Sequence, residues 1–255
     1  MDKQELKEYK EFSKLLALKS AAVIKKYFRT NVNFERKNDK SPVTIADKRA
    51  EEIMREMIKK EFPDHGILGE EFGEDNPAAE YKWVLDPIDG TKSFICGAQS
   101  FGTLIALLKN GNPVLGVINQ PILNEFLIGD GNTAELNGIP AKVRQCKNLE
   151  DAVLLTTDHF KVGKYHDQQK FDALVKKCFL YRNWGDAYGY YLVATGYADI
   201  MIDPIMSEWD KLALIPIIEG AGGKITNYSG GSPLEDESII AAAPGVHAKV
   251  IEFLK

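Results

Sequence analysis

Two carboxylates in the segment 83–91 are spaced so that they could bind a cation together. An apolar run ends at Asp86, and Asp89 then leads into a sharp turn at Gly90 and Thr91. Carboxylates three residues apart across such a turn can converge on one cation, while the amides of the turn are placed to meet an anion. A turn with a capping aspartate has the same composition, so this segment alone leaves both interpretations open.

Further acids lie at the ends of two other expected elements. Glu70 and Glu71 end a second apolar run, where ligands commonly bind in sheet proteins, although paired acids are also typical of a solvated loop. Asp210 lies in the first turn of an expected helix, where an aspartate ordinarily complements the helix dipole. With Asp86 and Asp89, these residues offer only oxygen ligands, and no His or Cys cluster accompanies them. Such a set indicates Mg²⁺ rather than zinc or copper.

An all-carboxylate cluster beside backbone amides is suited to phosphoryl transfer. Bound metal ions polarise a phosphoryl oxygen, activate a water and neutralise the leaving alkoxide. Other phosphatase chemistries lack their residues in this sequence: no cysteine is followed six residues later by arginine, no Arg-His pair occurs, and no Asp-x-Asp-x-Thr segment is present. The remaining route is direct attack of a metal-activated water on a phosphomonoester.

The elements that must position these acids follow from the hydrophobic pattern. Helical spacing predicts helices at 6–28 and 44–62, with a polar loop at 31–42 between them. Short apolar runs then predict strands at 67–68, 83–85, 103–108, 114–118 and 126–128, and Asn137-Gly138 predicts a hairpin.

After residue 149, strands and helices are expected to alternate. The strands are predicted at 153–156, 200–202, 224–226 and 238–241, and the helices at 168–179, 187–198, 209–219 and 247–254. Pro216 should kink the helix at 209–219, because proline removes a backbone donor. We expect a layered α/β architecture in two tightly packed halves, 1–150 and 151–255, since no Pro/Gly/Ser-rich linker separates them.

Composition narrows the class of protein. The 255 residues are 44% hydrophobic and 27% charged, which is the balance of a globular protein and excludes disorder. A formal net charge of −5 argues against nucleic acid or an anionic membrane as partner. Three scattered cysteines indicate a reducing compartment. With no leader pattern near the first residue and no apolar run of about 20 residues, we expect a cytoplasmic protein.

The acidic segments together resemble the inositol monophosphatase-like, magnesium-dependent, lithium-sensitive phosphatases. The resemblance rests on Gly69-Glu70-Glu71, on 86–91, and on Trp209-Asp210 followed by 219–223, and it extends over nearly the whole chain; 43–47 also resembles the family's Val-Thr-x-x-Asp element. It implies a layered αβαβα fold and two or three Mg²⁺ ions, with Mn²⁺ as an alternative. The implied metal ligands are Glu70, Asp86, the Ile88 carbonyl, Asp89 and Asp210, with Glu71 beside them through water.

The resemblance also implies catalytic residues, namely Thr91, Asp47 and the ligand Glu70. Thr91, with Asp47 behind it, would orient and deprotonate the attacking water, and the amides of Gly90 and Thr91 would hold the phosphate. A small-molecule phosphomonoester is the implied substrate, and a homodimer is the implied assembly.

The segment 182–190 resembles the histidinol-phosphate phosphatase branch more than the inositol branch. Asp186 stands where inositol phosphatases have a small residue, and Asp203 where they have a glutamate. Histidinol phosphate carries an ammonium and an imidazole, so a carboxylate in the pocket favours it, whereas neutral inositol would leave that charge poorly paired. Arg182 could reach the phosphate or order the acids. The structural alternative for Asp186 is a helix N-cap ahead of Ala187.

The sequence therefore predicts a phosphomonoesterase that hydrolyses L-histidinol phosphate to L-histidinol and phosphate in histidine biosynthesis. An inositol-1-monophosphatase or a broad-specificity sugar-phosphate phosphatase is the close alternative. A regulatory partnership with transcription or RNA machinery is the hypothesis from another class. The complete acid cluster argues against an inactive enzyme, and the negative net charge argues against direct contact with RNA.

Overall fold

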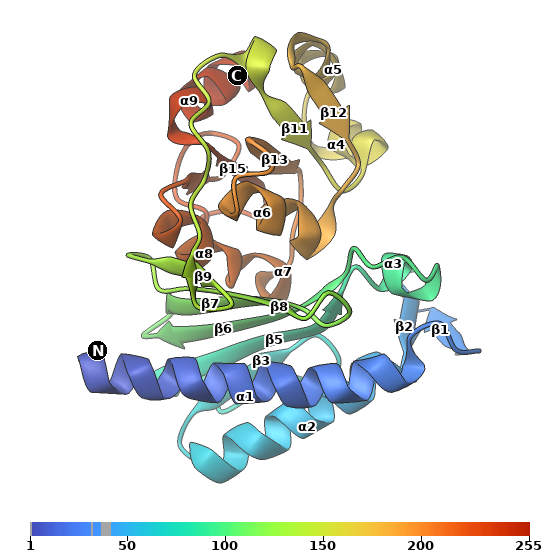
Figure 1. The fold of residues 1–255 in the computed structure, drawn as a ribbon, viewed down its shortest axis with the longest axis vertical. Helices are drawn as coiled ribbons and strands as arrows, with labels where there is room; N and C mark the ends of the chain where they lie inside the picture. Colours follow the sequence, from blue (N-terminus) through green and yellow to red (C-terminus); the bar gives the residue numbers. More distant parts are fainter. Residues whose placement is uncertain (1, 32, 37–41) are drawn as a thin grey trace.

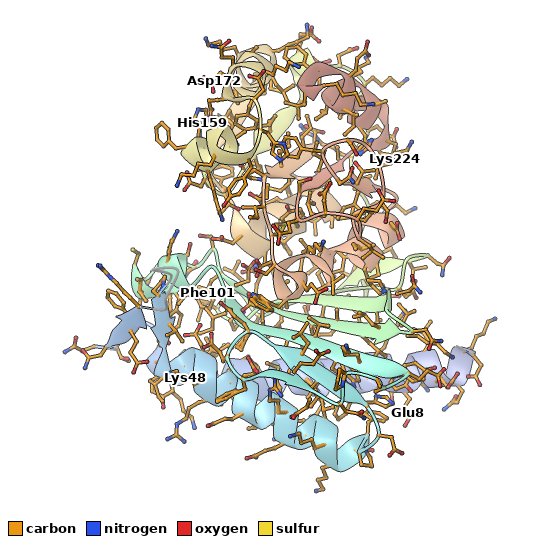
Figure 2. All side chains as sticks on the ribbon, turned by 180° about the vertical axis from the view of Figure 1, so that it is seen from behind. Glu8, Lys48, Phe101, His159, Asp172 and Lys224 are labelled. Carbon is orange, nitrogen blue, oxygen red and sulfur yellow. The ribbon has the colours of Figure 1, made fainter. Side chains whose placement is uncertain are left out.

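The computed structural model describes residues 2–31, 33–36 and 42–255. In these ranges, two main β-sheets alternate with three layers of helices, and the larger sheet lies on the side of the long amino-terminal helix (Figure 1). Side chains fill the spaces between the layers, whereas Glu8 and Lys224 project outward (Figure 2). The expected αβαβα architecture is confirmed.

The larger sheet carries most of the acidic segments. Within the described residues its strand order is β10-β9-β8-β7-β6-β5-β3-β4. Its strands are β3 (Gly66–Gly69), β4 (Gly73–Asp75), β5 (Tyr81–Asp89), β6 (Gly102–Lys109), β7 (Asn112–Gln120), β8 (Glu125–Gly129), β9 (Ala134–Leu136) and β10 (Ile139–Pro140). β3 and β5 are parallel, with Gly69 opposite Leu85. The residue after β3, Glu70, therefore lies beside the end of β5.

Two helices cover the outer face of this sheet. They are α1 (Lys3–Tyr27) and α2 (Ile45–Glu61), and their buried residues Leu16 and Met54 share a core cluster with Trp83 of β5. α2 begins with a capping box, in which the Thr44 side chain binds the backbone at Asp47 and the Asp47 side chain binds that of Thr44. This cap fixes Asp47 at the end of α2 that faces the acidic strand ends.

The smaller sheet belongs to the carboxyl-terminal part of the chain. In the described residues its order is β12-β11-β13-β15-β14. Its strands are β11 (Val153–Leu155), β12 (Leu180–Arg182), β13 (Ile200–Asp203), β14 (Lys224–Thr226) and β15 (Ile239–Ala242). α6 (Asp186–Ala194), α7 (Glu208–Lys211) and α8 (Leu214–Gly220) lie between the sheets, and α4 (His159–Tyr165), α5 (Gln168–Lys177) and α9 (Pro244–Leu254) cover the outer face. Two short helices remain, α3 (Thr91–Ile95) and η1 (Leu149–Asp151).

One buried cluster joins the two sheets through the middle helices. It contains Val84 of β5, Ile217 of α8 and Met201 of β13. The division near residue 150 into halves 1–150 and 151–255 stays a prediction. None of the helices in the described ranges has the length and apolar character needed to cross a bilayer. The cytoplasmic location stays a prediction as well.

Two sequence predictions are corrected. The expected loop at 31–42 contains a strand pair, β1 (Phe34–Arg36) with β2 (Pro42–Thr44), while residues 32 and 37–41 of that prediction lie outside the described residues. The expected helix at 209–219 is two helices that separate at Leu212 and Ala213, not at Pro216. The interruption lies one turn before the proline, because Pro216 offers no N–H to the carbonyl of Leu212.

Candidate active site

Three carboxylates meet between the two sheets. Asp86, Asp89 and Asp210 each offer one oxygen, and these atoms lie within 4.8 Å of one another. The first two come from the end of β5, where the pairing with β6 shifts register between them, and the third comes from α7. Asp86 also accepts a hydrogen bond from the Ile88 N–H at 3.0 Å. A local turn is therefore present together with the cluster, but no aspartate caps the helix that follows, because the N-cap of α3 is Gly90 without a side-chain hydrogen bond.

Asp210 is delivered to the cluster by the packing of its helix. Its carboxylate accepts from the Ser207 N–H at 3.0 Å, in a capping box that opens α7. The corner after α7 rests on β7, where a Cβ on Gly116 would lie 1.9 Å from the carbonyl oxygen of Ala213. Only glycine permits so close an approach of the helix corner to the strand.

The electrostatics of the cluster call for a cation. Burial and the neighbouring carboxylates raise the pKa of Asp86 and Asp89 well above the ordinary aspartate value, and burial raises the pKa of Asp210 to about 7. Among the described residues, no lysine or arginine forms an ion pair with any of the three. Clustered oxygen donors without a protein counterion fit a hard divalent cation such as Mg²⁺.

The other predicted ligands lie around this cluster. Glu70 lines the adjoining cavity, and its backbone N–H donates to the Leu85 carbonyl at 3.2 Å. The Ile88 carbonyl accepts from the Thr91 hydroxyl at 3.1 Å. Glu71 is partly buried beside Glu70 in the turn after β3.

Thr91 and Asp47 are adjacent, as the resemblance implied. The Thr91 Oγ1 lies 3.3 Å from Asp47 Oδ1, while Asp47 Oδ2 accepts from the N–H and the hydroxyl of Thr44 at 2.8 and 2.6 Å. Asp47 is fully buried, and burial raises its pKa. One carboxylate oxygen is therefore used to fix the side chain, and the other faces Thr91.

A buried ion pair behind Glu70 was not found from the sequence. Glu51 of α2, which is 0% exposed, accepts from Arg55 Nε at 2.7 Å and from the N–H groups of Glu71 and Phe72 at 2.8 and 3.2 Å. A Cβ on Gly69 would lie 2.0 Å from the Glu51 carboxylate. Glu51 thus holds the turn that presents Glu70. The signal that could have found it is an acid on the apolar face of α2.

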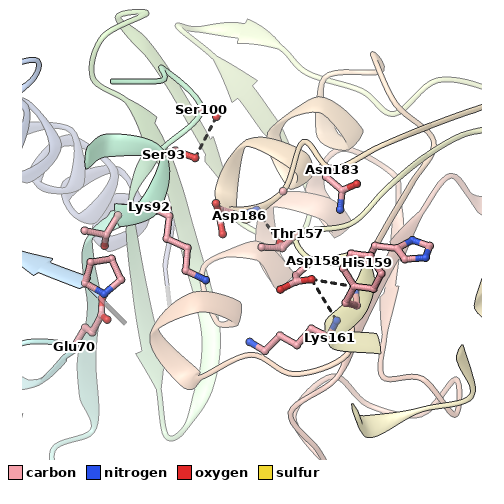
Figure 3. Close-up of a pocket in the computed structure, with 15 residues that line it drawn as sticks. Glu70, Lys92, Ser93, Ser100, Thr157, Asp158, His159, Lys161, Asn183 and Asp186 are labelled. Carbon is pink, nitrogen blue, oxygen red and sulfur yellow. Dashed lines mark hydrogen bonds between the residues drawn. The ribbon is translucent and has the colours of Figure 1, made fainter. Parts of the chain in front are cut away.

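A cavity of about 540 Å³ opens beside the cluster. It is lined by Glu70 and Gly90–Ser93 on the side of the larger sheet, and by 157–161 and Asp186 on the side of the smaller one (Figure 3). Lys92 of α3 and Lys161 of α4 lie near Asp186. Their positive charges act to lower its pKa and so offset part of the increase that burial causes. The sequence did not indicate either lysine or the segment 157–161.

Asp186 is in the cavity and is not a helix N-cap. The N-cap of α6 is Gly185, and no side chain caps this helix. Asp186 has a φ of 52°, and its carboxylate lies 3.0 Å from where a Cβ on Gly90 would be. Burial raises its pKa to about 6. The capping interpretation is wrong, because the side chain turns away from the helix amides toward the phosphate-side turn.

Arg182 and Asp203 are not among the described residues that line the cavity. Arg182 is exposed at the end of β12, and its Nη1 donates to the Tyr181 carbonyl at 2.7 Å. Asp203 is 4% exposed and accepts hydrogen bonds from Thr157 and Tyr190. Substrate contact by either residue stays a prediction.

The fold and the acid cluster define a phosphatase that acts on small phosphomonoesters, of a type that depends on metal. The chain belongs to the inositol monophosphatase family, which it matches over residues 5–254.

Similar proteins carry different substrate names. The bifunctional phosphatase IMPL2 of Arabidopsis thaliana is 44% identical over 94% of this chain and 70% of its own length. A histidinol-phosphatase of Chlorobaculum parvum is 41% identical over 89% of each chain. The structure of an inositol monophosphatase from Zymomonas mobilis has a TM-score of 0.87 at 36% identity, covering 97% of this chain and 98% of that one. The family is shared, whereas the substrate differs among its members.

Proposed function

We propose that this protein hydrolyses L-histidinol phosphate to L-histidinol and phosphate. The observation that carries the proposal is the Asp186 carboxylate, which lies in the cavity beside Gly90 instead of capping its helix. A partly buried carboxylate at this place favours a substrate with an ammonium group and disfavours one that offers only hydroxyls. The similarity to a histidinol-phosphatase supports the same substrate.

The metal would be held by the carboxylates of Glu70, Asp86, Asp89 and Asp210 and the carbonyl of Ile88, with Glu71 beside them through water. We expect two or three Mg²⁺ ions, which Mn²⁺ could replace. When bound, the metal supplies Lewis-acid stabilisation of the charge on the phosphoryl and leaving oxygens.

Thr91 and Asp47 are placed to take a proton from the attacking water. The Thr91 hydroxyl lies 3.1 Å from the Ile88 carbonyl and 3.3 Å from Asp47 Oδ1. When that carbonyl serves as a metal ligand, the single hydroxyl proton can be donated to Asp47 while the oxygen accepts from the water. The amides of Gly90 and Thr91, at the start of α3, are placed to hold the phosphate, because the first amides of a helix lack intrahelical partners.

The test measures kcat/KM for two substrates, in the wild type and in a variant that lacks the charge of Asp186. The wild type should show at least about tenfold higher kcat/KM for L-histidinol phosphate than for myo-inositol 1-phosphate, and Asp186→Asn should abolish that preference. Asp158→Asn is the matched control, since Asp158 also lines the cavity but its carboxylate caps α4 through the amides of Phe160 and Lys161. It should keep the preference. A higher kcat/KM for myo-inositol 1-phosphate would refute the proposal and favour the inositol phosphatase.

Two further expectations stay with the proposal. Arg182 is exposed near the cavity segment 183–186 and could contact the phosphate of a bound substrate. The homodimer implied by the family is the second expectation, and sedimentation equilibrium of the purified protein measures it directly.

A further inference from the structure

Asp186 adopts a backbone conformation that must be held in place. Its φ of 52° lies in the left-handed region, which aspartate tolerates but does not prefer. Such residues persist where surrounding contacts over-determine them. Residues that contact Asp186 and hold this conformation can therefore act on the substrate indirectly.

Two consecutive amides are anchored to different sheets. The N–H of Asp186 donates to Thr157 Oγ1 at 2.9 Å, after β11 of the smaller sheet, and the N–H of Ala187 donates to the carboxylate of Asp89 on the larger one. Gly185 touches the same threonine, since a Cβ there would lie 2.2 Å from the Thr157 Cα. The turn into α6 is thus clamped between Thr157 and Asp89.

Asp203 orients the hydroxyl that makes the first of these anchors. A hydroxyl has one proton to donate, and the Thr157 oxygen already accepts from the Asp186 N–H. Thr157 therefore donates to Asp203 Oδ2 at 3.1 Å, which leaves its oxygen free to accept from Asp186. The Thr157 N–H also donates to Asp203 Oδ1 at 3.1 Å, and Tyr190 donates its hydroxyl to Oδ2 at 3.0 Å. Both carboxylate oxygens of Asp203 are used inside the protein.

We infer that Thr157 and Asp203 are positioning residues for substrate selection, which hold Asp186 in the left-handed conformation that turns its carboxylate into the cavity. Asp203 then acts through Thr157, and Tyr190, which is 0% exposed, holds Asp203 from behind. The inference rests on the proposed function for its effect on selectivity, whereas its geometric part stands independently.

The geometric part is tested by crystal structures of two variants. In Thr157→Val, which cannot accept from the Asp186 N–H, Asp186 should leave the left-handed region and its carboxylate should withdraw from Gly90. In Thr157→Ser, which keeps the hydroxyl, both should stay. An unchanged Asp186 in Thr157→Val would overturn the inference, whatever the substrate of the enzyme.

The functional part is tested by a double-mutant cycle. We measure kcat/KM for L-histidinol phosphate and for p-nitrophenyl phosphate, which has no cationic group. Thr157→Val and Asp203→Asn should each lower the ratio of the two about tenfold, mostly through KM, and Thr157→Ser should restore it. In an Asp186→Asn background, neither change should lower the ratio further.

The controls separate positioning from a general structural role. If Thr157→Val and Asp203→Asn lower Tm and reduce kcat/KM equally for both substrates, the residues only support the core and the inference fails. Independent, additive losses in the Asp186→Asn background would also refute it. A wild type that prefers myo-inositol 1-phosphate would refute the proposed function, and the crystal structures would still decide the positioning.

Discussion

Two groups of acids in this protein have opposite surroundings. Asp199 and Glu51 are both 0% exposed, and each has an arginine: Arg144 Nε donates to Asp199 at 2.6 Å, and Arg55 Nε donates to Glu51 at 2.7 Å. The second group, the cluster at the end of β5 and the start of α7, has no such partner among the described residues. A buried acid with its own cation supports the scaffold, whereas several acids that converge without one indicate that the cation is supplied from outside.

The largest expected effect is on the unpartnered group. Asp89→Asn should lower kcat/KM about 10³-fold, because a metal ligand is worth several kcal/mol of transition-state stabilisation. Without metal, the Asp89→Asn variant should be at least as stable as the wild type without metal, since the change removes a charge from a cluster of acids that repel one another. Steady-state kinetics and thermal unfolding measure the two quantities. Normal activity in Asp89→Asn would overturn the metal assignment.

Asp199→Asn should show the reverse pattern. It leaves Arg144 unpaired and weakens the acceptor of the Val153 N–H at 2.7 Å, so the free energy of unfolding should fall by about 2–3 kcal/mol. The kcat/KM of the folded protein should stay within about twofold, because Asp199 does not line the cavity. Urea unfolding measures the loss. Glu150→Gln, which breaks an exposed pair with Lys177, is the control and should cost about 0.5 kcal/mol or less. Equal stability of the two variants would contradict the comparison.

The smallest effect is a pH dependence confined to the metal-free protein. The pKa of Asp210 is about 7 in the folded chain against 3.8 for the ordinary group, so the folded state keeps a proton that the unfolded chain has lost. Unfolding then releases protons, and Tm should fall as the pH rises from about 4 to 7, by roughly 2–4 °C for each kcal/mol. Excess Mg²⁺ should remove this slope. A metal-free Tm that rises over the same range would show that the cluster is not strained by its charges.

The sequence predicted the acid cluster well because its members sit in short local motifs at element ends. Asp86 and Asp89 follow one apolar strand, and Asp210 opens one helix, so each was found in its own segment. That Asp210 joins the other two was implied by the resemblance, since it depends on the packing of α7 against the larger sheet. The layered fold followed from the change of hydrophobic period near residue 65 and from the resemblance.

What could not be predicted depends on tertiary contacts or on backbone angles. Glu51 and Arg55 are an i,i+4 pair on the buried face of α2, and their contact with the turn after Gly69 joins segments that are distant in sequence. The left-handed φ of Asp186 is set by Thr157 and Asp89, which are distant in sequence. The helix α4 was missed because Gly163 interrupts a short segment, although Asp158 at its N-cap was an available signal.

The distant origin of Asp210 has a consequence for the order of folding. Asp86 and Asp89 are in place once β5 pairs with β3 and β6, but Asp210 arrives only when α7 docks onto the larger sheet. We expect contacts between segments so far apart to form late, because closing a long loop costs more conformational entropy than closing a short one. During refolding, tight metal binding should therefore appear with the last step, so that a bound ion marks a molecule whose two sheets have already come together.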